Sequence, residues 1–163
     1  MVCASPPCSS HPPRKKCSIV MPDVRLAVYQ CILETGRVPL AAQVASRLSI
    51  GEEDVRTEFR RLQDIHAFAL VPASDEILMA HPFSAVPTAY VVRTAGLAFW
   101  ANCAWDALAI PAMLGVDASV NARCADCGDP DLFTFSAGTL EAQAAVIHFA
   151  VPPRRFWENV VFT

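Results

Sequence analysis

The spacing of apolar residues divides the chain into a helical first half and a second half of short strands around one helix. Apolar residues recur at helical spacing over residues 24–36 and again over residues 38–48. Ser49 and Glu52 have the spacing of a capping box, which predicts that a third helix begins there. The inward face of this third helix is predicted to carry Val55, Phe59 and Leu62.

A hairpin is predicted after the three helices, from two short runs at residues 66–71 and 76–80 joined by a turn. Three helices and a hairpin are the outline of a winged helix-turn-helix, so residues 23–80 are predicted to form a helical, winged-helix-like subdomain. A DNA-binding regulator is the corresponding alternative function. In the third helix, however, carboxylates outnumber arginines, and an acidic helix repels phosphate. A subdomain that covers one side of the core is therefore favoured.

The second half, residues 81–163, is predicted to be a mostly antiparallel β-sheet part with a central helix, which makes the whole chain α+β. A connector rich in proline, residues 81–88, precedes a strand at residues 89–93 and a second strand that leads into Trp100. His81 in this connector is expected to satisfy a backbone hydrogen bond rather than to act in catalysis. Residues 118–123 and 132–135 are predicted to pair as a hairpin.

Further along, residues 144–151 form a short and nearly wholly apolar run, which predicts a central strand with His148 buried in it. Residues 154–159 are predicted to form a helical turn, and residues 160–163 to begin another strand.

The stretch with the clearest candidate chemistry is residues 99–115, where a thiol and a carboxylate lie among mostly apolar side chains. Asn102 is a good N-cap, so Cys103 is expected in the first turn of the helix, where free backbone N–H groups favour a thiolate. A spacing of three residues places Cys103 and Asp106 on one face, close enough for a proton to pass between them. The alternative is a buried thiol beside a carboxylate that only caps the helix.

The end of this helix is also encoded locally. Pro111 lacks a backbone N–H and is expected to end or kink the helix near Ile110, and Gly115 is a natural C-terminal stop.

These residues carry a resemblance to a known family. The Cys-x-x-Asp sequence followed by an Ile-Pro helix, with its flanking segments, resembles the bacterial organomercurial (alkylmercury) lyases over residues 24–163. The segments that carry the resemblance are residues 81–88, 102–108, 110–115, 145–152 and 156–163.

The resemblance implies cleavage of a carbon–mercury bond by protonolysis, giving a hydrocarbon and Hg(II). Cys103 matches the family's first mercury-binding cysteine, and Asp106 matches the aspartate that helps to move the proton. The implied reaction has no resident cofactor and uses an exogenous thiol as co-substrate. The implied partners are an organomercurial substrate, and cellular thiols or a mercuric reductase as acceptors of Hg(II).

One departure from the family pattern concerns the second mercury-binding cysteine, which in the family lies just beyond a segment like residues 156–163. The sequence ends at Thr163, so we expect either a truncated chain or an inactive or mercury-binding relative that lacks this ligand. Cys124 and Cys127 are candidates to replace it. Their Cys-x-x-Cys-Gly sequence is half of a zinc knuckle, and structural zinc, redox chemistry and a turn with two free thiols stay open.

The amino-acid composition limits the class of protein, its partners and its cellular compartment. With 163 residues, 53% apolar and 18% charged, the composition is that of a globular protein, and a formal charge of −3 argues against nucleic acid as a partner. No run of apolar residues has membrane-spanning length, and the N-terminal residues lack the apolar stretch that is typical of a signal peptide. The seven cysteines form no regular disulfide framework, which favours reduced thiols and a cytoplasmic location. Residues 1–22, rich in Pro and Ser, are predicted to be a disordered tail.

Overall fold

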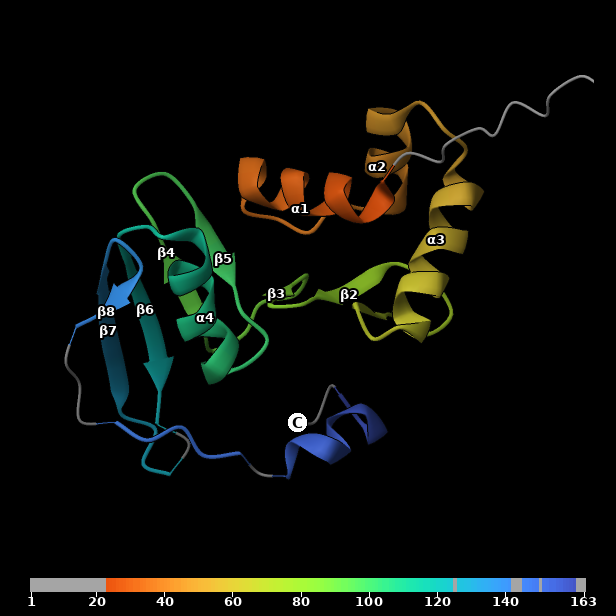
Figure 1. Cartoon of the computed structure of the whole chain (residues 1–163). Coiled ribbons are helices and arrows are strands. Elements are labelled where there is room, and N and C mark those ends of the chain that lie inside the picture. Colours follow the sequence, from red (N-terminus) through yellow and green to blue (C-terminus); the bar gives the residue numbers. More distant parts are fainter. Residues whose placement is uncertain (1–22, 125, 142–144, 150, 161–163) are drawn as a thin grey trace, which may run out of the picture.

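The computed structural model describes residues 23–124, 126–141, 145–149 and 151–160 (Figure 1). The predicted disordered tail, residues 1–22, lies outside the described residues. The same holds for residues 161–163 of the predicted last strand.

Three helices come first: α1 (Val24–Thr35), α2 (Ala41–Leu48) and α3 (Glu52–Asp64). The Asp23 carboxylate caps α1 by accepting the N–H of Leu26 at 2.9 Å. The capping box predicted at Ser49 is wrong. Since α2 runs on to Leu48, Ser49 becomes its C-cap in the left-handed conformation, and Gly51 is left as the residue before α3.

The predicted hairpin is present as β1 (Phe68–Leu70) and β2 (Ile77–Ala80), which pair antiparallel. A third strand, β3 (Phe83–Ser84), adds to β2 from within the predicted connector. It is too short to leave a periodic pattern in the sequence.

Ion pairs tie α3 to this sheet. All three arginines of the helix are paired, and two of them reach carboxylates of the turn between β1 and β2 or at its end. The pairs are Arg56 with Glu52 and Glu76, Arg60 with Glu53 and Asp75, and Arg61 with Glu58. The positive charge of α3 is thus neutralised within the subdomain, which favours a covering role over phosphate binding.

A five-stranded antiparallel sheet follows, in the order β5-β4-β6-β7-β8. Its strands are β4 (Val91–Arg93), β5 (Ala98–Trp100), β6 (Ala118–Arg123), β7 (Pro130–Ser136) and β8 (Thr139–Leu140). The helix α4 (Ala104–Leu114) lies on one face of this sheet (Figure 1). The chain is therefore α+β, with helices first and a mostly antiparallel sheet after them, as the sequence predicts.

The strand predicted at residues 144–151 is absent from the described part of that run. Residues 145–149 form no strand, His148 is exposed, and the side chain of Val146 is 92% exposed. An extended run needs a free strand edge to pair with, but β8 is two residues long and the chain then leaves the sheet. It leads instead to the 3₁₀ helix η1 (Pro153–Glu158), which confirms the predicted helical turn.

The helical part and the larger sheet share one core. Phe83 and Ala101 form an isolated antiparallel bridge between the two sheets. A second contact joins the end of α1 to β5. Gly36, the C-cap of α1, lies so close to Ala98 of β5 that a Cβ on Gly36 would be 2.7 Å from the Ala98 carbonyl oxygen. The junction of the two parts therefore lies beside the start of α4. Within the described residues, no helix is long and apolar enough to cross a membrane.

Candidate functional site

The start of α4 differs by one residue from the prediction. Cys103, not Asn102, is the N-cap, because Cys103 has extended backbone angles (φ −149°, ψ 179°) and its Sγ accepts the N–H of Asp106 at 3.4 Å. The thiol thus still meets a free N–H at the helix N-terminus. Asn102, released from capping, has its side-chain amide available for other partners.

The end of α4 is only partly as predicted. The helix continues through Pro111 to Leu114, so the expected end or kink near Ile110 is wrong. Proline removes one hydrogen bond, but Pro111 and Ile110 are fully buried, and we attribute the intact last turn to this packing. Gly115 ends the helix in the left-handed conformation with φ +65°, as predicted.

The bridge between Phe83 and Ala101 brings His81 to the start of α4. In this antiparallel register the residues before Phe83 lie opposite those after Ala101, and the N–H of Asn102 donates to the carbonyl oxygen of Pro82 at 3.3 Å. Two segments that are distant in the sequence therefore form one wall of the site.

The amide group of Asn102 connects two titratable side chains. Its Nδ2 lies 3.1 Å from Oδ2 of Asp106 and 3.4 Å from Nδ1 of His81. With both amide hydrogens donated, Nδ1 of His81 is the acceptor, which assigns the hydrogen of the neutral ring to Nε2. Nε2 of His81 and Oδ1 of Asn102 are buried and have no hydrogen-bond partner among the described residues.

The role predicted for His81 is therefore wrong. The imidazole ring satisfies no backbone group, because its Nδ1 faces the Asn102 amide. Only the main chain of His81 takes part in such a contact, where its carbonyl oxygen accepts the hydroxyl of Tyr29 at 2.8 Å.

These groups line a cavity of about 410 Å³. Its polar side consists of Cys103, Asp106, Asn102 and His81, and the rest of the wall is apolar and largely aromatic. The apolar residues are Met79, Trp105, Phe149, Pro153, Phe156, Trp157 and Val160.

The segment after residue 145 covers this cavity. The Trp157 ring stacks on His66 with centroids 4.1 Å apart and meets His81 edge-on at 5.3 Å. Phe149 packs against Trp105 at 6.3 Å and Phe156 at 5.4 Å. The aromatic residues of this segment thus wall the site instead of adding a strand to the sheet.

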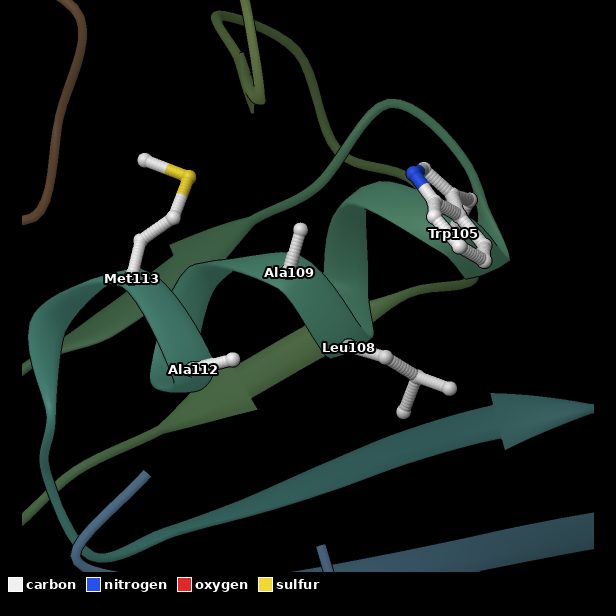
Figure 2. A pocket seen from close by; sticks show the side chains of 5 residues that line it. All are labelled: Trp105, Leu108, Ala109, Ala112 and Met113. Atoms are coloured by element: carbon white, nitrogen blue, oxygen red, sulfur yellow. The ribbon is translucent and has the colours of Figure 1, made fainter. Parts of the chain in front are cut away.

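A second depression, of about 450 Å³, runs along α4 and is shown in Figure 2. It is lined by Trp105, Leu108, Ala109, Ala112 and Met113. None of these side chains is titratable. The candidate chemistry therefore belongs to the other cavity, with which this groove shares Trp105.

Burial determines the protonation of the site. It raises the pKa of the Cys103 thiol, with the nearby Asp106 carboxylate adding to the rise and the backbone N–H groups of Asp106 and Trp105 opposing it. The sequence-based expectation of a favoured thiolate is thus wrong in direction, because burial outweighs the helix N-terminus. Burial also raises the pKa of Asp106, against the hydrogen bond from Asn102, and lowers the pKa of His81.

Comparison with known proteins places this geometry in a family. Residues 83–163, which include Cys103 and Asp106, match the family model described as alkylmercury lyase. This segment belongs to the alkylmercury lyase family. A crystal structure described as the mercury-bound form of MerB2 is similar to the chain, with 21% identity and a TM-score of 0.58. The match covers 76% of this chain and 60% of that one, so the chain spans less than two thirds of the length of MerB2. No curated protein matches the chain.

The alkylmercury lyase segment also holds the other two cysteines considered from the sequence. Cys124 and Cys127 are exposed in the turn between β6 and β7 and do not line the cavity. Hydrogen bonds from the backbone N–H groups of Cys127 and Asp126 lower the pKa of Cys124. The structure therefore brings Cys103 together with Asp106 but not with Cys124 or Cys127.

Several residue contacts of the cavity gave no signal in the sequence. His81 and Asn102 meet across a separation of 21 residues, and Trp157 reaches them from η1. Their only local sign was the position of Asn102 beside Cys103, which indicated a cap. These contacts depend on the pairing of β2 with β3 and on the bridge from β3 to the residue before Asn102. The spacing of apolar residues along the sequence gives no information about such long-range pairing.

Proposed function

We propose that the chain cleaves the carbon–mercury bond of organomercurials by protonolysis, giving a hydrocarbon and Hg(II). The observation that carries the proposal is the Cys103 thiol at the N-terminus of α4, whose Sγ accepts the backbone N–H of Asp106, with the thiol and the Asp106 carboxylate lining one cavity with apolar walls. Thiolate sulfur is a preferred ligand of a soft metal, and a carboxyl with a raised pKa can hold the proton that the reaction consumes.

In the first step, the sulfur of Cys103 bonds to mercury and displaces the anionic ligand of the organomercurial. The thiol proton passes to Asp106, or to the departing ligand, so that charge is conserved. A soft sulfur nucleophile and an adjacent proton acceptor three residues away are the two groups that this step requires.

In the second step, an exogenous thiol bonds to mercury through its sulfur. Asp106 delivers a proton to carbon, and the proton that the exogenous thiol loses goes to Asp106. The carbon–mercury bond breaks, the hydrocarbon leaves, and mercury stays between the sulfur of Cys103 and that of the co-substrate. A further thiol then exchanges with Cys103 and carries Hg(II) away. The apolar and aromatic side chains of the cavity, Trp105 and Trp157 among them, provide the contact surface for the organic group.

A cytoplasmic setting and thiol partners belong to the same proposal. The four described cysteines, Cys31, Cys103, Cys124 and Cys127, are free thiols, which suits a reducing compartment. We expect cellular thiols or a mercuric reductase to accept the Hg(II), because bound metal has to leave Cys103 before another substrate can enter.

The test measures hydrocarbon release and Hg(II) formation from a simple organomercurial in excess thiol. We expect turnover by the natural chain and by Cys31→Ser, which changes a thiol of α1 outside the cavity, and loss of turnover in Cys103→Ser and Asp106→Ala. Turnover that survives in Cys103→Ser would refute the assignment. Stoichiometric mercury binding that needs Cys103, without hydrocarbon release, would identify a mercury-binding relative instead.

A further inference from the structure

A second pair of thiols lies in the turn between β6 and β7, away from the cavity. Cys124 follows the last residue of β6, and Cys127 lies three residues later, both exposed. The turn is closed by backbone hydrogen bonds, from Cys124 to the carbonyl oxygen of Asp129 at 2.9 Å and from Gly128 to that of Cys124 at 3.0 Å. The Arg123 guanidinium adds a bond to the Gly128 carbonyl at 3.0 Å.

Both cysteines belong to one turn whose backbone is closed on itself. The hydrogen bonds of Cys124 with Asp129 and Gly128 span Cys127, so the two side chains start from neighbouring points of the chain. The Cys127 thiol also donates to Oδ2 of Asp129 at 3.2 Å. Gly128, with φ +74°, provides the left-handed residue that bends the chain directly after the second cysteine. Both thiols thus lie in one short turn and are open to solvent.

We propose that Cys124 and Cys127 form a two-thiolate site for a soft, two-coordinate cation, with Hg(II) as its ligand. Thiolates select soft metals, and Hg(II) is satisfied by two sulfur ligands in line. Zinc takes four ligands, whereas the described residues contain no group of three or more His, Cys, Asp or Glu placed to hold a metal. The donor set therefore fits mercury and leaves zinc incompletely ligated.

Loading of the site is a ligand exchange without a change of oxidation state. Mercury arrives as a complex with two small thiols, forms bonds to the sulfur atoms of Cys124 and Cys127, and releases both small thiols carrying the two protein protons. Since the exchange needs only Hg(II), the site does not depend on cleavage at Cys103. It extends mercury chemistry from the cavity to the surface of the same sheet.

The test uses the full chain with Cys3, Cys8, Cys17, Cys31 and Cys103 all replaced by serine, which leaves this pair as the only thiols. The probe is Hg(II) presented with excess small monothiol. After gel filtration, we expect one equivalent of mercury per chain and the ultraviolet absorption of a mercury–dithiolate. A further Cys127→Ser change is expected to weaken retention by at least about 100-fold, because the second sulfur no longer acts at a high effective concentration.

Retention of one equivalent by the single-thiol variant, or no retention by the pair, would overturn the proposal. Equal retention of Zn(II) would overturn the assignment to a soft two-coordinate cation. If the serine-substituted chain does not fold by circular dichroism, the same Cys127→Ser change is made in the natural chain. There the expected result is a loss of one equivalent of bound mercury, and an unchanged stoichiometry would contradict the site.

Discussion

Replacing Asn102 by leucine tests the site without touching the thiol or the carboxylate. The change removes the hydrogen bond from Nδ2 to Oδ2 of Asp106, which contributes about 1.5–3 kcal/mol as a bond to a charged group, and the bond to Nδ1 of His81, which contributes about 0.5–1.5 kcal/mol. It also removes Oδ1, a buried acceptor without a partner among the described residues, whose desolvation costs about 1–3 kcal/mol. The removal of this cost offsets most of the loss. We therefore expect the free energy of unfolding to fall by about 1 kcal/mol, and by less than about 2 kcal/mol.

The same substitution is expected to move the pH dependence of the reaction. Burial raises the pKa of Asp106, and the Asn102 hydrogen bond is the largest effect that opposes this rise. Without Asn102 the native pKa rises further, so the carboxylate that accepts the thiol proton forms only at higher pH. The acid limb of kcat/KM for organomercurial cleavage should therefore shift to higher pH, since this ratio reports the ionisation of the free enzyme.

The assays are urea denaturation and a pH series of hydrocarbon release. Asn121→Leu is the matched control, because Asn121 is an exposed asparagine in the middle of β6. An acid limb of Asn102→Leu that coincides with that of the natural chain would refute the role of the amide. A loss of stability well above 2 kcal/mol would show that removal of the buried Oδ1 atom brings no compensating gain.

Three further experiments test the packing of Gly138 against the end of α4, the charge of Asp106 and the imidazole of His81. Gly138→Ala should lower the free energy of unfolding in urea by about 2–4 kcal/mol, because φ is +77° and a Cβ would lie 2.8 Å from the backbone after α4. Gly128 also has a positive φ (+74°) but has open space around it, so Gly128→Ala should lose only the stability that a left-handed alanine costs. An equal loss of stability in the Gly138 and Gly128 variants would contradict this reasoning. Asp106→Asn should raise Tm at every pH above the native pKa of this carboxyl and give no gain below the ordinary aspartate pKa, because burial raises this pKa and penalises only the charged form; calorimetry at several pH values checks the sign. His81→Asn keeps an acceptor near the position of Nδ1 for the Asn102 amide and should retain the acid limb of kcat/KM, whereas His81→Gln should shift it. Identical pH profiles of these two variants would exclude the contact at Nδ1.

Local patterns in the sequence predicted the elements whose pattern is long enough to read. The strand at Ala118–Arg123 agrees residue for residue, and the three helices and the first hairpin lie where periodicity places them. The two-residue strands β3 and β8 are too short for any pattern. The prediction of a strand over residues 145–149 was wrong, because this segment lies at the cavity, which Phe149 lines. An apolar composition alone does not distinguish a segment that lines a cavity from a central strand.

The candidate site follows the same division between local and long-range information. Cys103 and Asp106 were predicted together because three residues along a helix are neighbours in space. The contact of His81 with Asn102 was not predicted, because it depends on the bridge between Phe83 and Ala101, which joins two sheets. The direction of the Cys103 pKa was missed for a related reason, since the walls that bury the thiol come from η1 and from β2.

This reversal of the pKa direction fits the proposed chemistry better than the original expectation. Protonolysis consumes a proton at carbon, so a site that rests as thiolate and carboxylate could bind mercury but would hold no proton to deliver. Burial raises the pKa of both Cys103 and Asp106, which favours retention of a proton between them until a soft metal displaces it from sulfur. In the proposed reaction, the aromatic side chains of the C-terminal segment thus have a chemical role as well as a structural one: they add to the burial that keeps a proton on Cys103 or Asp106 until it is transferred to carbon.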